Sequence, residues 1–396
     1  MNSGLKKLHP YPFEKMAEMR KELTPPSDKK LINLSIGEPK LQTPKIVLES
    51  LAKQLTTTNK YPTTRGMVEL RNTISEWATR RFNLDAGQLN PATQILPVNG
   101  TREALFSIAN TILDKTSAKN IVGLPNPFYQ IYEGAALLAG GVPYYFDCPE
   151  SKSFLPQIED VPTTVWEKMA FVYVCSPGNP SGSVMRANDY KKLLELAEKF
   201  NFYIIADECY SELYDFTKEP PLGLLDWCNR YGNNTFKRCL VMHSLSKRSS
   251  CPGLRSGFVA GDPHLMTDYY QYRTYHGGAM PIHIQYASIA AWSDEEHVII
   301  AREFYRNNFK CVYQVLNQHI EITIPEAGFY LWIKLPIDDI SMCKCLFAEK
   351  GVLLLPGQYL GRTLDGRNPG ENMVRMALVE SKERCQYAAE SMLSII

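Results

Sequence analysis

The residues best suited to chemistry lie in the segment SLSKRSSCPGLRSG, which runs from Ser244 to Gly257 and sets one lysine among small hydroxyl residues. Ser244 and Ser246 precede Lys247, and Arg255 follows it by eight residues. Hydroxyls, backbone N–H groups and a guanidinium suit a phosphate monoester. A lysine held among them suits a covalent bond to an aldehyde. The segment therefore predicts a site for a ligand that carries both groups.

Pyridoxal phosphate is a cofactor with both groups, and it needs further partners elsewhere in the chain. Its protonated ring nitrogen requires a buried carboxylate, and Asp207 follows an apolar stretch in FYIIADECY. Tyr210 lies three residues later, and Asn179 lies in the tight turn SPGNPSG, where a cis peptide bond is expected. Both side chains can donate to the phenolic oxygen of the cofactor. Each residue alone also fits a helix cap, a core residue or a turn.

A helix N-terminus is a second expected anchor for the phosphate, because its free N–H groups and its dipole favour an anion. The stretch VNGTREAL offers one, since Gly100, Thr101 and Arg102 open a predicted helix directly after a predicted strand. An ordinary capping threonine produces the same pattern. The signal therefore supports the phosphate site only in combination with the lysine segment.

Alternating strands and helices must bring these residues together. Short apolar segments predict buried strands at residues 94–100, 120–127, 169–180 and 202–210. Amphipathic segments between them predict helices at residues 101–113, 129–140 and 189–200. This alternation predicts an α/β fold with a mostly parallel sheet covered by helices on both faces. Ligands of such sheets bind at the carboxyl ends of the strands.

The order of predicted strands and helices is less regular toward the two ends of the chain. We predict a short strand at residues 31–36, helices at 44–55 and 67–82, and a long helical stretch at roughly 282–319. Antiparallel strands within 320–336 and another helix-and-strand segment precede a C-terminal helix. We therefore divide the chain into an N-terminal segment (1–43) associated with a small domain, a large cofactor-binding domain (44–280) and a small α+β domain (281–396).

The bulk composition narrows the classes of function. The chain has 396 residues, 44% hydrophobic and 21% charged, with a formal net charge of +1, which is typical of a soluble globular protein. We expect no nucleic-acid partner and no membrane partner, because the charge is balanced and no long apolar run is present. The ten cysteines lack metal-ligand spacing, so we expect reduced core thiols, no metal site and a cytoplasmic location.

Nine motifs in order resemble one family over about residues 33–378. They are GEP, YPTTRG, NGTREAL, NPFYQIY, SPGNPSG, ADECY, SLSKRSSCPGLRSG, GFYLW and VRMAL. The set resembles the fold type I aminotransferases of the aspartate aminotransferase superfamily, class I/II. The resemblance implies pyridoxal 5'-phosphate as cofactor and a large domain with a mostly parallel, seven-stranded sheet between helices, plus a smaller α+β domain. It also implies amino-acid and 2-oxo-acid substrates.

The resemblance also implies roles for single residues. Lys247 would bond to the cofactor and later move a proton, Asp207 would pair with the pyridinium, and Asn179 and Tyr210 would contact the phenolic oxygen. The implied phosphate cup consists of Ser244, Ser246, Arg255 and the turn Gly100, Thr101 and Arg102.

Further residues are implied by the same motifs. Tyr129, rather than the adjacent Phe128, would stack on the pyridine ring. Arg375 would hold the substrate α-carboxylate, with Asn179 and the backbone of Gly37 beside it. Tyr61 would reach the phosphate of a neighbouring subunit, which implies a homodimer with active sites at the subunit interface.

Three stretches bear on the substrate: LHPYPFEKM, NKYPTTRGMVELR and LPGQYLGRTLDGRNPGENMVRMAL. They look most like the bacterial N-succinyl-L,L-diaminopimelate aminotransferases of lysine biosynthesis, which implies amino transfer to 2-oxoglutarate. The distal carboxylates of that substrate would need cationic or hydroxyl partners, and our candidates are Arg65, Arg362 and Tyr11.

Other functions remain open at this point. The same residues would serve an aspartate, aromatic or N-acetylornithine-type aminotransferase, or a C–S β-lyase. A cofactor-sensing regulatory domain is the non-enzyme alternative. That alternative expects a basic helix-turn-helix module beside the aminotransferase part, and the balanced charge argues against it.

Overall fold

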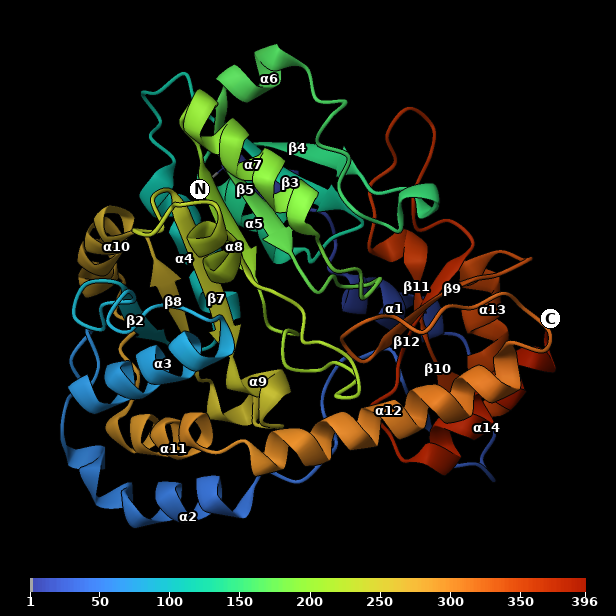
Figure 1. Cartoon of the computed structure of the whole chain (residues 1–396). Helices are drawn as coiled ribbons and strands as arrows, with labels where there is room; N and C mark the ends of the chain where they lie inside the picture. Colours follow the sequence, from blue (N-terminus) through green and yellow to red (C-terminus); the bar gives the residue numbers. More distant parts are fainter. Residues whose placement is uncertain (1–2) are drawn as a thin grey trace.

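A seven-stranded sheet forms the centre of the fold in the computed structural model, which describes residues 3–396 (Figure 1). The strand order is β2-β8-β7-β6-β5-β3-β4, and β8 alone runs antiparallel to its neighbours. The strands are β2 (Ile95–Val98), β3 (Ile121–Asn126), β4 (Val142–Asp147), β5 (Met169–Cys175), β6 (Tyr203–Asp207), β7 (Cys239–Ser244) and β8 (Gly257–Gly261). The predicted α/β fold with a mostly parallel sheet is confirmed.

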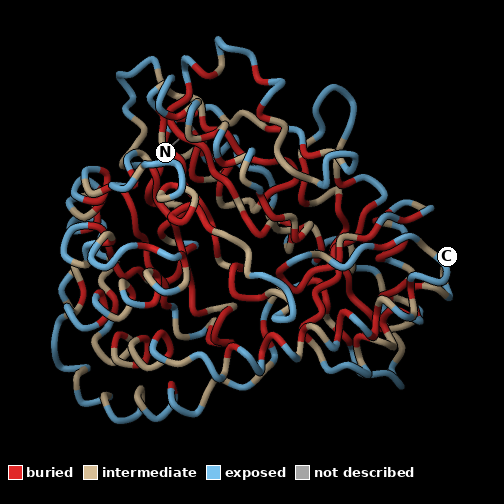
Figure 2. The backbone as a smooth tube through the Cα atoms, viewed as in Figure 1, coloured by how far each residue is buried: buried red, intermediate tan, exposed pale blue. Residues whose placement is uncertain are grey.

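Helices cover both faces of this sheet because side chains alternate along each strand. In β6, Ile204 and Ala206 belong to one hydrophobic core and Ile205 to the other. The first core contains α3 (Val68–Arg81), α7 (Ala187–Phe200), α8 (Leu224–Arg230) and α11 (Ile282–Ser293). The second contains α4 (Thr101–Ile112), α5 (Ile131–Leu138) and α10 (Pro263–His276). Figure 2 shows the sheet as the most continuously buried part of the backbone.

A second group of elements packs around its own core. Strand β1 (Ile32–Asn33) pairs in parallel with β10 (Val352–Leu353). A three-stranded antiparallel sheet has the order β11 (Leu355–Pro356), β12 (Met373–Ala377) and β9 (Tyr330–Lys334). Helices α12 (Glu296–Leu316), α13 (Asp339–Cys345) and α14 (Lys382–Leu393) contribute to the same core. Of the predicted segment 320–336, only β9 is a strand.

The remaining elements are short and lie at the periphery or between the larger ones. The α-helices are α1 (Pro12–Arg20), α2 (Lys45–Lys53), α6 (Thr163–Glu167) and α9 (Leu245–Arg248). The single turns of 3-10 or π type are η1 (Ser3–Lys7), η2 (Leu55–Asn59), η3 (Glu150–Lys152), η4 (Pro252–Leu254), η5 (Leu346–Lys350) and η6 (Gly357–Tyr359).

The helical stretch predicted at 282–319 is present, and the structure divides it into two helices, α11 and α12. Asp294, between the two, has an extended backbone with φ −113° and ψ 135°. Its carboxylate accepts a hydrogen bond of 3.2 Å from the N–H of His297 in the first turn of α12. An aspartate in this position stabilises a new helix start, which breaks an otherwise continuous apolar pattern.

Helix α12 runs from the region of α11 across to α14, so it connects the two groups of elements (Figure 1). Helix α11 packs against α2 and α3 and shares their core. The division of the chain at residues 43 and 280 stays a prediction. The packing of α11 leads us to propose a later second boundary, near Asp294.

Two further observations concern the chain as a whole. Within residues 3–396, no helix combines the length and the hydropathy needed to cross a bilayer. All ten cysteines lie in the described part of the chain as free thiols, and most of them are buried.

Candidate active site

A cavity of about 440 Å³ lies at the carboxyl ends of β6 and β7, whose last residues are Asp207 and Ser244. This is the edge of the sheet at which the sequence pattern predicts a ligand. Most of the predicted site residues line it: Tyr11, Gly37, Thr101, Arg102, Tyr129, Asn179, Asp207, Tyr210, Ser244, Ser246, Lys247, Arg255 and Arg375.

Lys247 projects into this cavity from α9, a single helical turn that follows β7. Ser244 caps the turn, since its Oγ accepts a hydrogen bond of 3.1 Å from the N–H of Ser246. The Lys247 Nζ donates to the carbonyl oxygen of Gly37 and lies 5.6 Å from the ring centre of Phe329. Burial disfavours the charged amine and lowers the pKa of Lys247 to about 8. A neutral amine is therefore available for bonding to a carbonyl at a lower pH than on an exposed lysine.

Asp207 ends β6 as a buried carboxylate, facing the same cavity. Its Oδ2 accepts 2.7 Å from the hydroxyl of Tyr132, and its Oδ1 accepts 3.3 Å from the N–H of Cys209. Burial raises the pKa of Asp207, and these two donors oppose that rise. A cationic nitrogen would find its counter-charge here. The sequence analysis missed Tyr132, although its position on α5 three residues after Tyr129 was a usable signal.

At the phosphate end of the predicted site, two glycines leave space that the side chain of any other residue would fill. Gly100 has φ +82°, and a Cβ on it would lie 2.3 Å from Nη2 of Arg255. A Cβ on Gly257 would lie 2.6 Å from the carbonyl oxygen of His243. Thr101 begins α4, so the N–H groups of its first turn are free for an anion. Hydroxyls, a helix N-terminus and a guanidinium fit the phosphate of pyridoxal phosphate.

Arg375, on β12, enters the cavity from the opposite side. It is 4% exposed, donates 2.8 Å to Oδ1 of Asn179 and 2.7 Å to the carbonyl oxygen of Ser35, and lies over the ring of Tyr330. In the described part of the chain its Nε has no hydrogen-bond partner. A buried donor without a partner fits a carboxylate ligand. The peptide bond between Asn179 and Pro180 is cis, as expected.

Aromatic rings complete the cavity wall. Tyr129 lines the cavity, whereas the adjacent Phe128 is buried in the core, which fits the preference for Tyr129 as the stacking residue. The hydroxyl of Tyr129 accepts a 2.6 Å hydrogen bond from Nε of Arg102. The hydroxyls of Tyr210 and Tyr330 lie 3.0 Å apart.

Four predicted residues do not line the cavity of this chain: Gly100, Tyr61, Arg65 and Arg362. Tyr61 is fully exposed, so its predicted contact depends on a second subunit. Arg65 donates 2.8 Å to the carbonyl oxygen of Ala92 and stacks on the ring of Tyr270.

Arg362 is occupied by an internal partner. It makes a two-pronged ion pair with Glu133, with distances of 2.7 Å from Nε and 2.5 Å from Nη2. Both side chains are almost fully buried. A guanidinium paired in this way is not free for a substrate carboxylate, because the carboxylate of Glu133 already neutralises its charge.

Comparison with known proteins decides the family. Residues 29–392 match the family described as "Aminotransferase class I and II". The chain is a class I and II aminotransferase. This aminotransferase is 31% identical over 392 residues to the LL-diaminopimelate aminotransferase of Aquifex aeolicus (strain VF5), covering 98% of this chain and 96% of that relative.

Solved structures of aminotransferases share the whole fold. A crystal structure of an aminotransferase from Neisseria meningitidis Z2491 is 44% identical, with a TM-score of 0.95 and full coverage of both chains. The aminotransferase AspB from Helicobacter pylori 26695 is 34% identical, with a TM-score of 0.90 and 98% coverage of both chains. Class I and II aminotransferases depend on pyridoxal phosphate, so the predicted cofactor is confirmed for this aminotransferase.

Proposed function

We propose that this aminotransferase moves the amino group of N-succinyl-L,L-diaminopimelate to 2-oxoglutarate. The observation that carries the proposal is the guanidinium of Arg102, which lines the cavity and, among residues 3–396, forms no ion pair. Its nearest polar partners are the hydroxyls of Tyr129 and Tyr11, at 2.6 and 3.4 Å. A cation with only neutral partners favours an anionic group of the substrate.

The charges on the cavity wall support a substrate with more than one carboxylate. Arg255 lies at the phosphate end and Arg375 is assigned to the α-carboxylate, which leaves Arg102 for a distal carboxylate. We therefore assign the distal subsite to Arg102 and Tyr11. This assignment retains Tyr11 from the sequence-based candidates and replaces Arg65 and Arg362. It also moves the Arg102 side chain from the phosphate cup, to which the family resemblance assigned it, to the distal subsite.

The residues have the following proposed roles. When bound, pyridoxal phosphate supplies the aldehyde that receives the amino group and the ring that withdraws electrons. Asp207 holds the proton on the ring nitrogen, and Asn179 and Tyr210 donate to the phenolic oxygen. Arg375 orients the α-carboxylate. The Lys247 Nζ then removes the proton from the substrate Cα, for which its lowered pKa of about 8 is well matched.

LL-diaminopimelate itself is a second candidate donor, because the Aquifex aeolicus relative carries that name. Its distal end bears a free ammonium, which calls for an unpaired carboxylate beside Arg102. Glu38 is the only acidic cavity residue besides Asp207 in the described chain, and it is paired with Lys40 at 2.6 Å. The succinylated donor, whose distal nitrogen is a neutral amide, therefore fits the cavity better.

A donor panel with 2-oxoglutarate tests the proposal. It includes N-succinyl-L,L-diaminopimelate, LL-diaminopimelate, aspartate, an aromatic amino acid and N-acetylornithine. We expect the highest kcat/KM for the succinylated donor. A higher value for LL-diaminopimelate would transfer the assignment to the second candidate, and a higher value for a donor without a distal carboxylate would refute the role of Arg102.

Three variants sharpen this test. Arg102→Met should lower kcat/KM for the succinylated donor roughly 10- to 100-fold, as expected for one lost charge-assisted hydrogen bond, and should affect alanine much less. Arg80→Met, at an exposed position on α3, is the control for loss of one positive charge. Lys247→Ala should abolish nearly all turnover with every donor.

We also propose that the enzyme is a homodimer in which Tyr61 reaches the neighbouring active site. The family resemblance assigns Tyr61 to a subunit contact, and its ring is fully exposed in one chain, so it is free to reach a partner. Sedimentation of the holoenzyme tests the assembly. Tyr61→Phe tests the contact, since it should weaken cofactor binding without changing the mass of the particle.

A further inference from the structure

Helix α9 carries two adjacent basic residues with separate environments. Lys247 lines the cavity, whereas Arg248 is 1% exposed and faces the junction between α11 and α12. Neighbouring residues of a helix point about 100° apart, so a rotation of α9 that moves one side chain must move the other. One helical turn has little stability alone, and its orientation depends on tertiary contacts.

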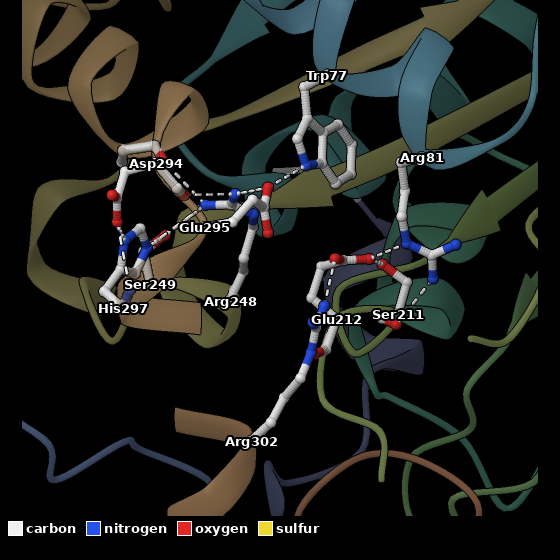
Figure 3. A network of polar contacts seen from close by, with 11 residues as sticks. Trp77, Arg81, Ser211, Glu212, Arg248, Ser249, Asp294, Glu295, His297 and Arg302 are labelled. Atoms are coloured by element: carbon white, nitrogen blue, oxygen red, sulfur yellow. Dashed lines mark hydrogen bonds and ion pairs between the residues drawn. The ribbon is translucent and has the colours of Figure 1, made fainter. Parts of the chain in front are cut away.

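Arg248 provides several of these contacts at once (Figure 3). Its Nη1 donates 2.7 Å to the carbonyl oxygen of Ala291, and its Nη2 donates 3.0 Å to that of Asp294 and 2.5 Å to Oε1 of Glu295. The guanidinium also lies 4.9 Å from the ring centre of Trp292. The rigid fork thus binds the end of α11 and the start of α12 together.

Ser249 and His297 form a second connection at the same place (Figure 3). The Nε2 of His297 lies 2.8 Å from Oγ of Ser249, and its Nδ1 contacts the carboxylate of Asp294. Two consecutive residues after Lys247 are therefore held by the junction between α11 and α12.

The second turn of α12 is attached to the other chain segment of the site. Glu212, two residues after Tyr210, binds Arg302 of α12 at 2.9 Å and Arg81 of α3 at 2.6 Å. Arg302 also donates 2.7 Å to the carbonyl oxygen of Glu212. The start of α12 is thus a common support for the segments that carry Lys247 and Tyr210.

We propose that Arg248 is a positioning residue for Lys247, which fixes the orientation of α9 by anchoring it to the α11–α12 junction. Its effect on the reaction passes through the placement of the Lys247 Nζ. A misplacement of about 1 Å can cost roughly 100-fold in rate, so the anchor should matter to turnover more than to substrate binding. The inference rests on the role proposed above for Lys247.

The test compares Arg248→Met and Arg248→Lys with the wild-type holoenzyme. Methionine removes every donor, and lysine keeps the charge but loses the fork. We expect kcat to fall roughly 100-fold in Arg248→Met, with KM changed less than about 3-fold and a smaller loss in Arg248→Lys. The second readout is the pH midpoint of the absorbance band of the lysine-bound cofactor, which should shift by roughly half a unit or more in both variants.

Arg71→Met is the matched control, because Arg71 is another buried arginine of the fold and contacts Pro91 rather than this network. We expect it to lower the unfolding temperature without moving the absorbance midpoint. If the Arg248 variants behaved in the same way, with wild-type kcat and midpoint, the inference would be overturned. If Arg248→Met does not fold, the kcat and the absorbance midpoint of Arg248→Lys decide the test. A wild type that never bonds the cofactor at Lys247 would refute the proposed function instead.

Discussion

The hydroxyl of Tyr132 donates a 2.7 Å hydrogen bond to Oδ2 of Asp207, and both side chains are buried. Tyr132 in turn stacks on Tyr173, with ring centres 4.7 Å apart. A donor to a carboxylate stabilises its ionised form. Tyr132 therefore helps to keep Asp207 charged, as its proposed role beside the cofactor ring requires.

Tyr132→Phe should weaken binding of pyridoxal phosphate roughly 10-fold, because the pKa of Asp207 rises when one donor is lost. Equilibrium dialysis of the apoenzyme against the cofactor measures the change. Tyr173→Phe is the matched control: its hydroxyl binds the carbonyl oxygen of Leu105 and does not contact Asp207. Equal affinities in the two variants would contradict the role of Tyr132.

Gly100→Ala should weaken cofactor binding roughly 10-fold or more, since the new Cβ displaces the guanidinium of Arg255 from the phosphate end. Gly87→Ala is the control, because it introduces the same backbone strain without a clash. Gly87 has φ +79°, close to the +82° of Gly100, but no atom lies within 4 Å of its added Cβ. Both variants should lose stability on thermal unfolding, and only Gly100→Ala should lose affinity.

The uptake of pyridoxal phosphate by the apoenzyme should depend on pH with a midpoint near 8. Burial lowers the pKa of Lys247 to about 8, so the amine is protonated and unreactive below that pH and neutral above it. The rate of covalent attachment should therefore rise with pH through this midpoint and then level off. Stopped-flow absorbance measures the rate. A rise that continued up to pH 10 would mean that Lys247 is not buried in solution.

Glu212→Gln should destabilise the enzyme by about 3–5 kcal/mol at pH 7, because it leaves Arg81 and Arg302 without a counter-charge in a buried site. Burial alone would raise the pKa of Glu212, but the two arginines outweigh burial and hold the pKa below its ordinary 4.5. The stabilisation is therefore present above the unfolded pKa and disappears as the pH falls through the lowered folded pKa.

Thermal unfolding of wild type and Glu212→Gln across pH 3–7 checks this prediction. The difference in unfolding temperature should be largest at pH 7 and should shrink only below about pH 4.5. A constant difference at all pH values would indicate that the substitution acts through packing instead of charge.

The parts of the site that local sequence determines were predicted well. Asp207 is the last residue of the apolar strand β6, and Lys247 follows the end of β7 by three residues. The carboxyl ends of these neighbouring parallel strands meet at one edge of the sheet. The α/β fold with a mostly parallel sheet followed from the alternation of apolar and amphipathic segments, whereas the seven strands were implied by the family resemblance. These predictions needed no knowledge of contacts between distant side chains.

The contacts that a residue makes with a distant part of the chain, or with a second chain, could not be predicted in this way. Arg362 resembled a free cation, but Glu133 neutralises it from 229 positions away in the chain. Tyr61 requires a second chain. The division of the helical stretch at Asp294 was not predicted, because the apolar periodicity continues across it; there the Asp294 carboxylate accepts a hydrogen bond from the first turn of α12.

The segment that bears Lys247 and Arg255 has its two ends on adjacent antiparallel strands, where Ser244 and Gly257 are direct cross-strand neighbours. The hydrogen bonds between β7 and β8 hold the two ends of this segment together, so the segment is a closed loop. A change in its length would alter the spacing between the amine and the guanidinium while the strand register stayed intact. The length of one closed loop thus limits how far apart the amine of Lys247 and the guanidinium of Arg255 can lie.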